Sequence, residues 1–178
     1  MKTQNFEIVS AKSNIDWIGR KVTGAHNGTI GIKQGVLAFD NGKLSGGRFI
    51  IDTTSIKILD VTDPATNEQF AGHLASDDFF NSKNYPESVL VINSVTSGGN
   101  NTYHVEGDLT IKGITHPIAF EAQIDDADDE VITASGRIVI DRTKYGMKFR
   151  SGNFFKDLGD TLIYNEFDLN VKITAKAA

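Results

Sequence analysis

Apolar and polar residues alternate with a period of two along four segments in the second half of the chain. In the first of these segments, the apolar face comprises Tyr103, Val105, Gly107, Leu109 and Ile111. The same alternation recurs at residues 117–125, 131–141 and 166–175. Successive side chains of a β-strand leave opposite faces of the sheet, so the pattern predicts strands that each bury one face.

The first half of the chain is rich in β-branched and aromatic residues, but its alternation is less regular. Strands are predicted at residues 13–21, 28–39, 46–59 and 87–95. Turn signals stand at Asp40–Gly42, Ser97–Asn101 and Asp125–Asp129. The Asn-Gly pair of the first turn favours a type I′ hairpin, which needs positive φ angles. Roughly eight to ten strands with little helix indicate an all-β sandwich or barrel, formed by residues 1–178 as one domain.

One segment, Thr62–Asn81, breaks this pattern and predicts a helix. Asp63 or the threonine before it can cap the helix, and Pro64 suits the first turn. Phe70 and Leu74 lie one turn apart and form a narrow apolar stripe. The helix is therefore expected to pack one side against the sheet.

A second aromatic group follows within the same segment. Ser76–Asp78 resembles a second capping sequence, and Phe79 and Phe80 come directly after it. The residue before a proline avoids helical geometry, so Tyr85-Pro86 returns the chain to an extended run. The sequence thus predicts a short helical element near residues 62–81 in an otherwise β-rich chain.

Composition and charge narrow the class of protein. With 178 residues, 39% of them hydrophobic, the chain suits one well-buried globular domain. The net charge of −5 and the scattered Lys and Arg residues argue against a nucleic-acid partner, which needs a clustered basic face. No apolar run reaches membrane-spanning length. The first residues lack the apolar core of a signal peptide, so the expected location is cytoplasmic, or periplasmic or secreted if a leader was removed.

Few residues are candidates for catalysis or metal binding. Cysteine is absent, which excludes thiolate metal sites, and the histidines at positions 26, 73, 104 and 116 share no close spacing. We therefore expect no metal, no cofactor and no sensitivity to EDTA. The acidic run at Asp125–Asp129 falls at a predicted turn and lacks the spaced ligands of a calcium loop. No nucleophile elbow, P-loop or dinucleotide fingerprint is present.

The stretch Ile140–Phe155 mixes charged residues with aromatic ones. We interpret it as a strand end with an internal Asp141–Arg142 pair, whose aromatics fill the mouth of a barrel. The alternative is a polar anchor for the head group of a ligand. Alternation alone does not decide whether the inward aromatics fill a solid core, because an eight-stranded barrel can be packed or can hold one small ligand.

Several motifs in one order resemble the YceI-like family, which is also called the polyisoprenoid-binding family. The resemblance covers nearly the whole chain. It rests on Trp17 with Gly19 and Lys21, and on the stretches Gly46–Ile56, Gly72–Pro86, Val105–Phe120 and Ile140–Gly146. It implies a lipocalin-like, elongated, antiparallel eight-stranded β-barrel with a helical segment packed at the barrel. It further implies an amphiphile with a long isoprenoid tail in an internal tunnel, no catalysis, and a bacterial protein of a family that is often exported.

On this basis we expect the protein to bind, carry or store a hydrophobic isoprenoid-type lipid. The alternatives are a ligand-free structural or stress-response barrel with a packed core, and an enzyme on a barrel scaffold. A homodimer is compatible with the sequence. The helical segment is expected to seal the barrel and to open for the ligand. The predicted ligand-binding residues are Trp17, Phe49, Ile51, Phe70, Leu74, Phe79, Phe80, Leu109, Ile111, Phe120, Ile138, Phe149, Phe167 and Leu169.

Overall fold

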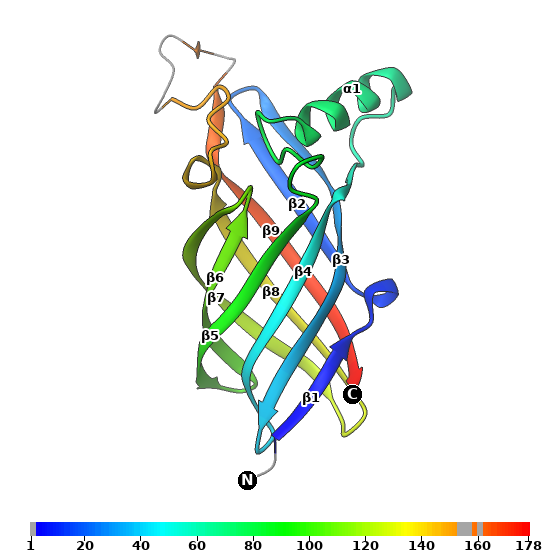
Figure 1. Ribbon diagram of the computed structural model, residues 1–178, viewed down its shortest axis with the longest axis vertical. Helices are drawn as coiled ribbons and strands as arrows, with labels where there is room; N and C mark the ends of the chain where they lie inside the picture. Colours follow the sequence, from blue (N-terminus) through cyan, green and yellow to red (C-terminus); the bar gives the residue numbers. More distant parts are fainter. Residues whose placement is uncertain (1–2, 153–157, 160–161) are drawn as a thin grey trace.

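The structure is a computed structural model that describes residues 3–152, 158–159 and 162–178. Its strands form one sheet, and the one α-helix among these residues stands at one end of the sheet (Figure 1). The strands are β1 (Thr3–Ile8), β2 (Asn14–Lys21), β3 (Gly24–Asp40), β4 (Lys43–Ile58), β5 (Glu87–Gly99), β6 (Thr102–Ile111), β7 (Ile114–Ala127), β8 (Val131–Asp141) and β9 (Ile163–Ala177). The helices are α1 (Pro64–Ala75) and the 3-10 turns η1 (Ser10–Lys12) and η2 (Arg142–Tyr145).

The sheet closes into an antiparallel barrel with eight strand positions, as predicted. The hydrogen-bonded order runs from β2 through β9, β8, β7, β6, β5 and β4, and β4 then pairs with β3 to complete the ring. Strands β1 and β2 share one position, because both lie between β3 and β9 at different heights. The short turn η1 joins them. Closure pairs the strand edges that an open sheet would expose.

The predicted hairpin turn between β3 and β4 is confirmed. Asn41 and Gly42 have φ angles of 51° and 80°, which are the positive values that a type I′ turn requires. Asp40 pairs with Lys43 directly across this turn. A similar pair, Asn100 and Asn101, has positive φ angles between β5 and β6. Local turn chemistry therefore sets the register of two neighbouring hairpins.

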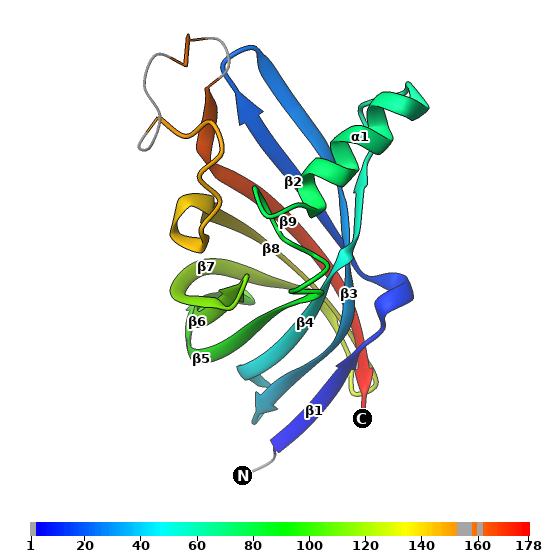
Figure 2. The ribbon, with the colours of Figure 1, turned by 45° about the horizontal axis from the view of Figure 1, so that its top comes forward.

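The ladder between β7 and β8 is incomplete towards the α1 end. Pairing runs from Ala127 to Glu121 on β7 and stops there, so residues 114–120 of β7 have no partner on β8. Figure 2 shows the coil of η2 beside β7 in this region. Tyr145 and Met147, both 1% exposed, pack into the core next to it. Side-chain packing thus closes a part of the wall that backbone hydrogen bonds leave open.

The predicted helix is present but shorter than expected. Asp63 caps α1, and its Oδ2 accepts a hydrogen bond from the Thr66 amide at 3.0 Å. The helix ends at Ala75, where the Ser76 hydroxyl donates back to the His73 carbonyl at 2.6 Å. The prediction of a second helical start at Ser76–Asp78 is wrong, because this serine closes the first helix and residues 77–80 form turns. No helix in the described part of the chain is long and apolar enough to cross a membrane.

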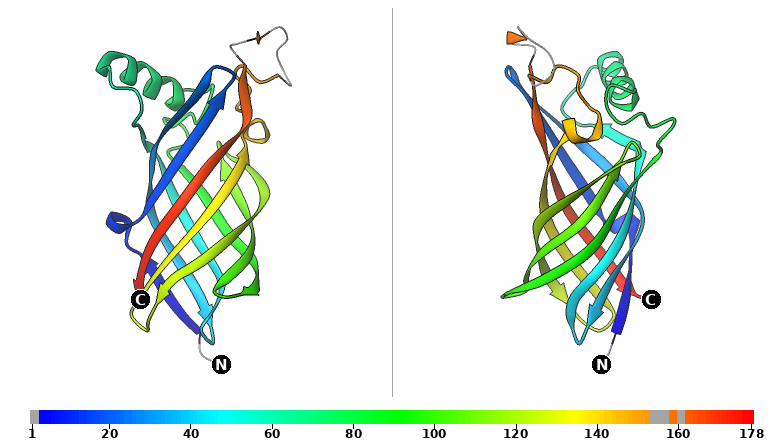
Figure 3. Two further views of the ribbon diagram at one scale, coloured as in Figure 1. Left: turned by 180° about the vertical axis from the view of Figure 1, so that it is seen from behind. Right: turned by 60° about the vertical axis from the view of Figure 1, so that its left-hand side comes forward.

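Two clusters of buried side chains lie inside the barrel. The first includes Phe6, Phe39 and Tyr103 and belongs to the end that carries both chain termini. The second includes Phe79 and Tyr145 and belongs to the end near α1. Figure 3 shows from two further sides that α1 and the termini stand at opposite ends of the barrel. The inward faces predicted by alternation on β6, β7, β8 and β9 are confirmed, since their apolar residues supply these clusters.

Candidate ligand-binding cavity

A cavity of about 570 Å³ lies inside the barrel, is lined by residues of both clusters and reaches the α1 end. This volume is in the range of sites that hold small-molecule ligands. Most of its wall consists of inward-facing apolar residues. All fourteen residues predicted as ligand contacts line it: Trp17, Phe49, Ile51, Phe70, Leu74, Phe79, Phe80, Leu109, Ile111, Phe120, Ile138, Phe149, Phe167 and Leu169. Their contact with a ligand stays a prediction.

Trp17 owes its position to a glycine on the neighbouring strand. Gly28 pairs with Trp17, and a Cβ added there would lie 1.8 Å from the Lys57 carbonyl oxygen and 2.6 Å from the indole ring. Only glycine therefore permits this arrangement of the indole against β3. The Trp17 Nε1 is buried and has no hydrogen-bond partner within the described residues. The Trp17 side chain lines the cavity.

Helix α1 stands over the mouth of the cavity, and the face that it turns towards the cavity carries both polar and apolar residues. Thr66, Gln69, Phe70, His73 and Leu74 line the cavity, with the i, i+3, i+4 spacing of a single helix face. No residue of α1 is buried. The ring of Phe70 meets the ring of His26 edge-on, with 4.7 Å between centroids. The helix therefore covers the mouth with only light packing.

The turn after α1 is held much more firmly than the helix. Phe79 is 8% exposed, and its ring meets the rings of His73 and Phe149 at centroid distances of 5.0 and 5.9 Å. The buried Ser82 hydroxyl donates to the Thr53 carbonyl at 3.0 Å. The Thr53 hydroxyl in turn donates to the Tyr85 carbonyl at 2.7 Å. The predicted sealing segment therefore divides into an exposed helix and an anchored aromatic turn.

Arg142 differs from its predicted role. The expected Asp141–Arg142 ion pair is absent from the described residues, because Asp141 instead accepts hydrogen bonds from the Thr143 amide and hydroxyl. The guanidinium of Arg142 turns inward, lines the cavity and donates to backbone carbonyls. Burial lowers the pKa of Arg142, although the charge of Asp141 acts in the opposite direction. Phe154 and Phe155, which were expected to fill the mouth, lie outside the described residues.

Other polar residues at the mouth were not predicted as site residues. The charged or ionisable side chains that line the cavity are Arg20, Lys21, His26, His73, Arg142, Arg150, Tyr164 and Glu166. The helix residues among the lining set could have been found from the 3.6-residue periodicity that aligns them with Phe70. The others come from strand ends and loops, where no periodic signal marks the direction of a side chain.

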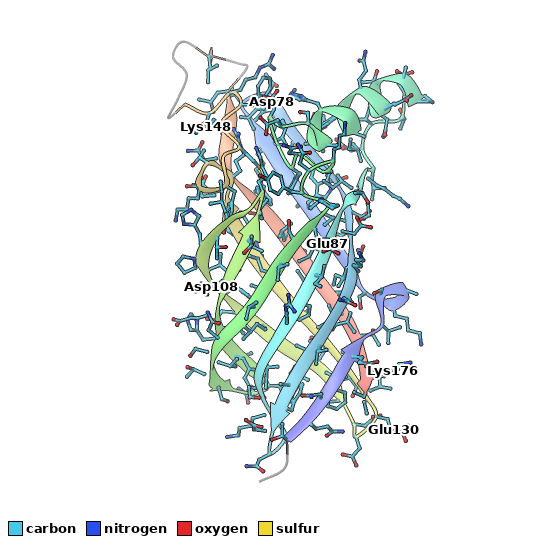
Figure 4. All side chains as sticks on the ribbon, viewed as in Figure 1. Asp78, Glu87, Asp108, Glu130, Lys148 and Lys176 are labelled. Atoms are coloured by element: carbon cyan, nitrogen blue, oxygen red, sulfur yellow. The ribbon has the colours of Figure 1, made fainter. Side chains whose placement is uncertain are left out.

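Charged residues otherwise occupy the outside of the barrel and its two ends. In Figure 4, Asp78 and Lys148 lie at the α1 end, and Glu130 and Lys176 lie at the opposite end. His104 contacts Glu121 at 2.7 Å and Glu106 at 3.4 Å, and hydrogen bonds to these carboxylates raise its pKa. Within the residues described, no three His, Cys, Asp or Glu side chains gather closely enough to hold a metal.

Asp168 is the one buried acid of the outer wall among the described residues. Its Oδ2 accepts hydrogen bonds from Arg20 at 2.9 Å and from Arg137 at 2.7 Å. Burial alone would raise the pKa of Asp168, but the two arginines together lower it. The three residues come from β2, β8 and β9, so the ion pairs join adjacent strands.

A family model described as the YceI-like domain matches residues 6–175. The chain belongs to the YceI-like family. A UPF0312 protein of Pseudomonas putida is 31% identical over 96 residues, which are 54% of this chain and 47% of the relative. A UPF0312 protein of Shewanella denitrificans is 30% identical over 89 residues, 50% of this chain and 44% of the relative. The matched part spans about half the length of these curated relatives.

Solved structures support the same YceI-like fold at lower sequence identity. BcnA of Burkholderia cenocepacia superposes with a TM-score of 0.71 at 22% identity, over 92% of this chain and 96% of BcnA. A polyisoprenoid binding domain of Saccharophagus degradans, implicated in plant cell wall breakdown, gives a TM-score of 0.68 at 12% identity, over 97% and 98% of the two chains. The predicted family and the predicted barrel are both confirmed.

Proposed function

We propose that this YceI-like protein binds a hydrophobic, isoprenoid-type lipid inside its barrel and carries or stores it without chemical change. The supporting observation is the apolar cavity, whose walls are built from the inward residues of the strands. Burial of each methylene-sized group contributes about 0.8 kcal/mol, so such a wall binds a long tail with few polar contacts. The polyisoprenoid binding domain of Saccharophagus degradans has the same fold, which supports a prenyl tail.

The two alternatives have less support. A ligand-free barrel with a packed core would leave no cavity of about 570 Å³. An enzyme would need titratable groups that converge on one point of the cavity. His26 and His73, which line the mouth, each lie against a carboxylate, Asp60 at 2.8 Å and Asp78 at 2.9 Å. These pairs stand beside α1, and the deeper wall is apolar.

Organic extraction of the purified protein, followed by mass spectrometry, tests the proposal. We expect a prenyl-tailed molecule in stoichiometric amount, and its release to acceptor vesicles would distinguish carriage from storage. The absence of any lipid from the extract, together with no uptake of prenyl lipids by the delipidated protein, would contradict the proposal.

A blocked cavity provides the matched control. Ala122 lines the cavity, and Ala119 on the same strand is exposed on the outside. Ala122→Trp should exclude two to three methylene groups of the tail, which costs about 2 kcal/mol, or roughly thirtyfold in affinity. Ala119→Trp adds the same indole outside the barrel and should leave binding unchanged. Equal binding by both variants would place the ligand outside the cavity.

A further inference from the structure

One cation in the wall of the cavity has no acidic partner among the described residues. Arg142 is 3% exposed. Its Nη1 donates to the carbonyl of Met147 at 2.6 Å, and its Nε and Nη2 donate to the carbonyls of Tyr164 and Ile163, both at 3.0 Å. These neutral acceptors orient the guanidinium. Asp141, whose charge acts on Arg142 from the adjacent position, and Glu166, which also lines the cavity, form no ion pair with it.

Such an arrangement is unfavourable unless another group completes it. Transfer of a charge from water into a protein interior is costly when no opposite charge accompanies it. A guanidinium carries five N–H donors, and the carbonyls of the described residues use three of them, so two remain. An arginine keeps its charge at physiological pH. The guanidinium therefore lacks a partner that carries one negative charge and accepts two hydrogen bonds.

The position of the guanidinium places this site on the path of a ligand. Its central carbon lies 5.9 Å from the centre of the Phe79 ring, which lines the same cavity. Three other basic groups at the mouth have acidic partners: Arg20 pairs with Asp168, His26 with Asp60, and His73 with Asp78. Lys21 and Arg150 also line the cavity without an ion pair among the described residues, but Lys21 is only half-buried and Arg150 is exposed to water. Arg142 is therefore the buried cation of this wall that lacks an ion-pair partner.

We propose that the ligand of the cavity ends in a carboxylate and that Arg142 binds this head group. The inference rests on the proposed function, because it assigns the polar end of the same ligand. A carboxylate accepts two parallel hydrogen bonds from one guanidinium and carries one negative charge. A diphosphate would bring more charge than the one buried cation balances, and it would also need the less buried Lys21 and Arg150. The apolar wall suits a prenyl tail and a straight acyl tail alike, so the experiment compares both.

Affinities of the delipidated protein for matched ligands test the head group. The pairs are geranylgeranoic acid with geranylgeraniol, and palmitic acid with 1-hexadecanol, with geranylgeranyl diphosphate as the fifth ligand. At pH 7 we expect an acid to bind about ten- to a hundredfold more tightly than its alcohol, and more tightly than the diphosphate. The tail class with the higher affinity identifies the source of the carboxylate.

The outcomes separate the two proposals. Equal affinities for acid and alcohol, or tightest binding of the diphosphate, would overturn the carboxylate inference and leave lipid binding intact. Binding of none of the five ligands would overturn both proposals.

Variants assign the effect to Arg142. Arg142→Gln should remove the preference for acid over alcohol and change the affinity for the alcohol by less than about threefold. Arg48→Gln makes the same change at an exposed position on β4 and should keep the preference. A preference that survives Arg142→Gln would refute the role of this residue.

A measurement on the unchanged protein covers the case in which Arg142→Gln does not fold. Palmitic acid labelled with ¹³C at its carboxyl group is titrated by NMR, once free and once bound. The guanidinium should hold the pKa of the bound carboxyl below that of the free acid. A bound carboxyl whose pKa equals or exceeds the free value would contradict the inference.

Discussion

Replacement of Phe79 by alanine should destabilise the protein far more than replacement of Leu74, although both residues line the mouth of the cavity. Phe79 is 8% exposed and belongs to the buried cluster at the α1 end. Leu74 is only partly buried and lies on α1, where no residue is buried. The comparison therefore separates the anchored aromatic turn from the exposed helix.

The structure sets the size of each effect. Removal of a buried phenylalanine side chain costs about 3–5 kcal/mol. The ring of Phe79 already faces a cavity on one side, so fewer contacts are lost and we expect about 3 kcal/mol. A fully buried Leu→Ala change costs about 2–5 kcal/mol. Leu74 is half-buried and leaves a space that water can enter, so we expect about 1 kcal/mol.

Urea denaturation followed by circular dichroism measures both changes. The midpoints should fall while the slope of the free energy against urea stays constant, because the same surface is exposed on unfolding. A loss of about 3 kcal/mol lowers the melting temperature of a chain of this size by roughly 6–12 °C. Leu59→Ala, at a position that is 61% exposed, serves as the control and should change stability by less than about 0.5 kcal/mol. Equal losses for Phe79→Ala and Leu74→Ala would refute the division into two parts.

Three further predictions concern titration and dynamics. NMR titration should give His104 a pKa above 6.5, and this pKa should fall in Glu121→Gln. Because the folded pKa is raised, the His104–Glu121 pair contributes its whole stabilisation below the unfolded pKa. This stabilisation is lost as pH rises through the folded pKa. Asp168 has a lowered folded pKa, so its stabilisation is present above the unfolded pKa and disappears as pH falls through the folded one. Asp168→Asn should cost about 1–2 kcal/mol at pH 7 and less at pH 3, as measured by urea denaturation at both pH values. If the helical segment closes over a ligand, bound lipid should slow hydrogen exchange in Phe70–Phe80 more than in the hairpin at Asp125–Asp129. Equal protection of Phe70–Phe80 with and without lipid would show that this segment is an ordinary part of the core and does not act as a gate.

Local patterns in the sequence predicted the features that depend on neighbouring residues. Alternation identified the inward faces of β6 to β9, the Asn41-Gly42 pair identified a hairpin turn, and Asp63 identified the start of α1. Each of these depends on residues that are close in the chain. The end of α1 was missed because a single hydroxyl, that of Ser76, acts there as the partner of a helix carbonyl rather than as a new cap.

Features that depend on long-range pairing could not be predicted in the same way. The shared position of β1 and β2 follows from their pairing with different parts of β3 and β9, which lie far away in the sequence. The role of Arg142 has the same origin. Two of its acceptors are carbonyls of Ile163 and Tyr164, about twenty residues away on another strand, and backbone carbonyls have no signature in the sequence. A neighbouring aspartate was the partner that the sequence suggested.

The presence of the cavity depends on the sizes of inward side chains across the ladder, which alternation does not specify. Tyr103, Ala122, Gly136 and Val171 are successive partners across β6, β7, β8 and β9. Two neighbours in this row carry at most a methyl group, so part of the interior remains open between them. Towards the chain termini, by contrast, the aromatic rings of Phe6 and Phe39 meet at 5.4 Å and fill the barrel. An eight-stranded barrel has an interior of nearly fixed width, so the same fold is closed where large side chains meet and hollow where small ones do.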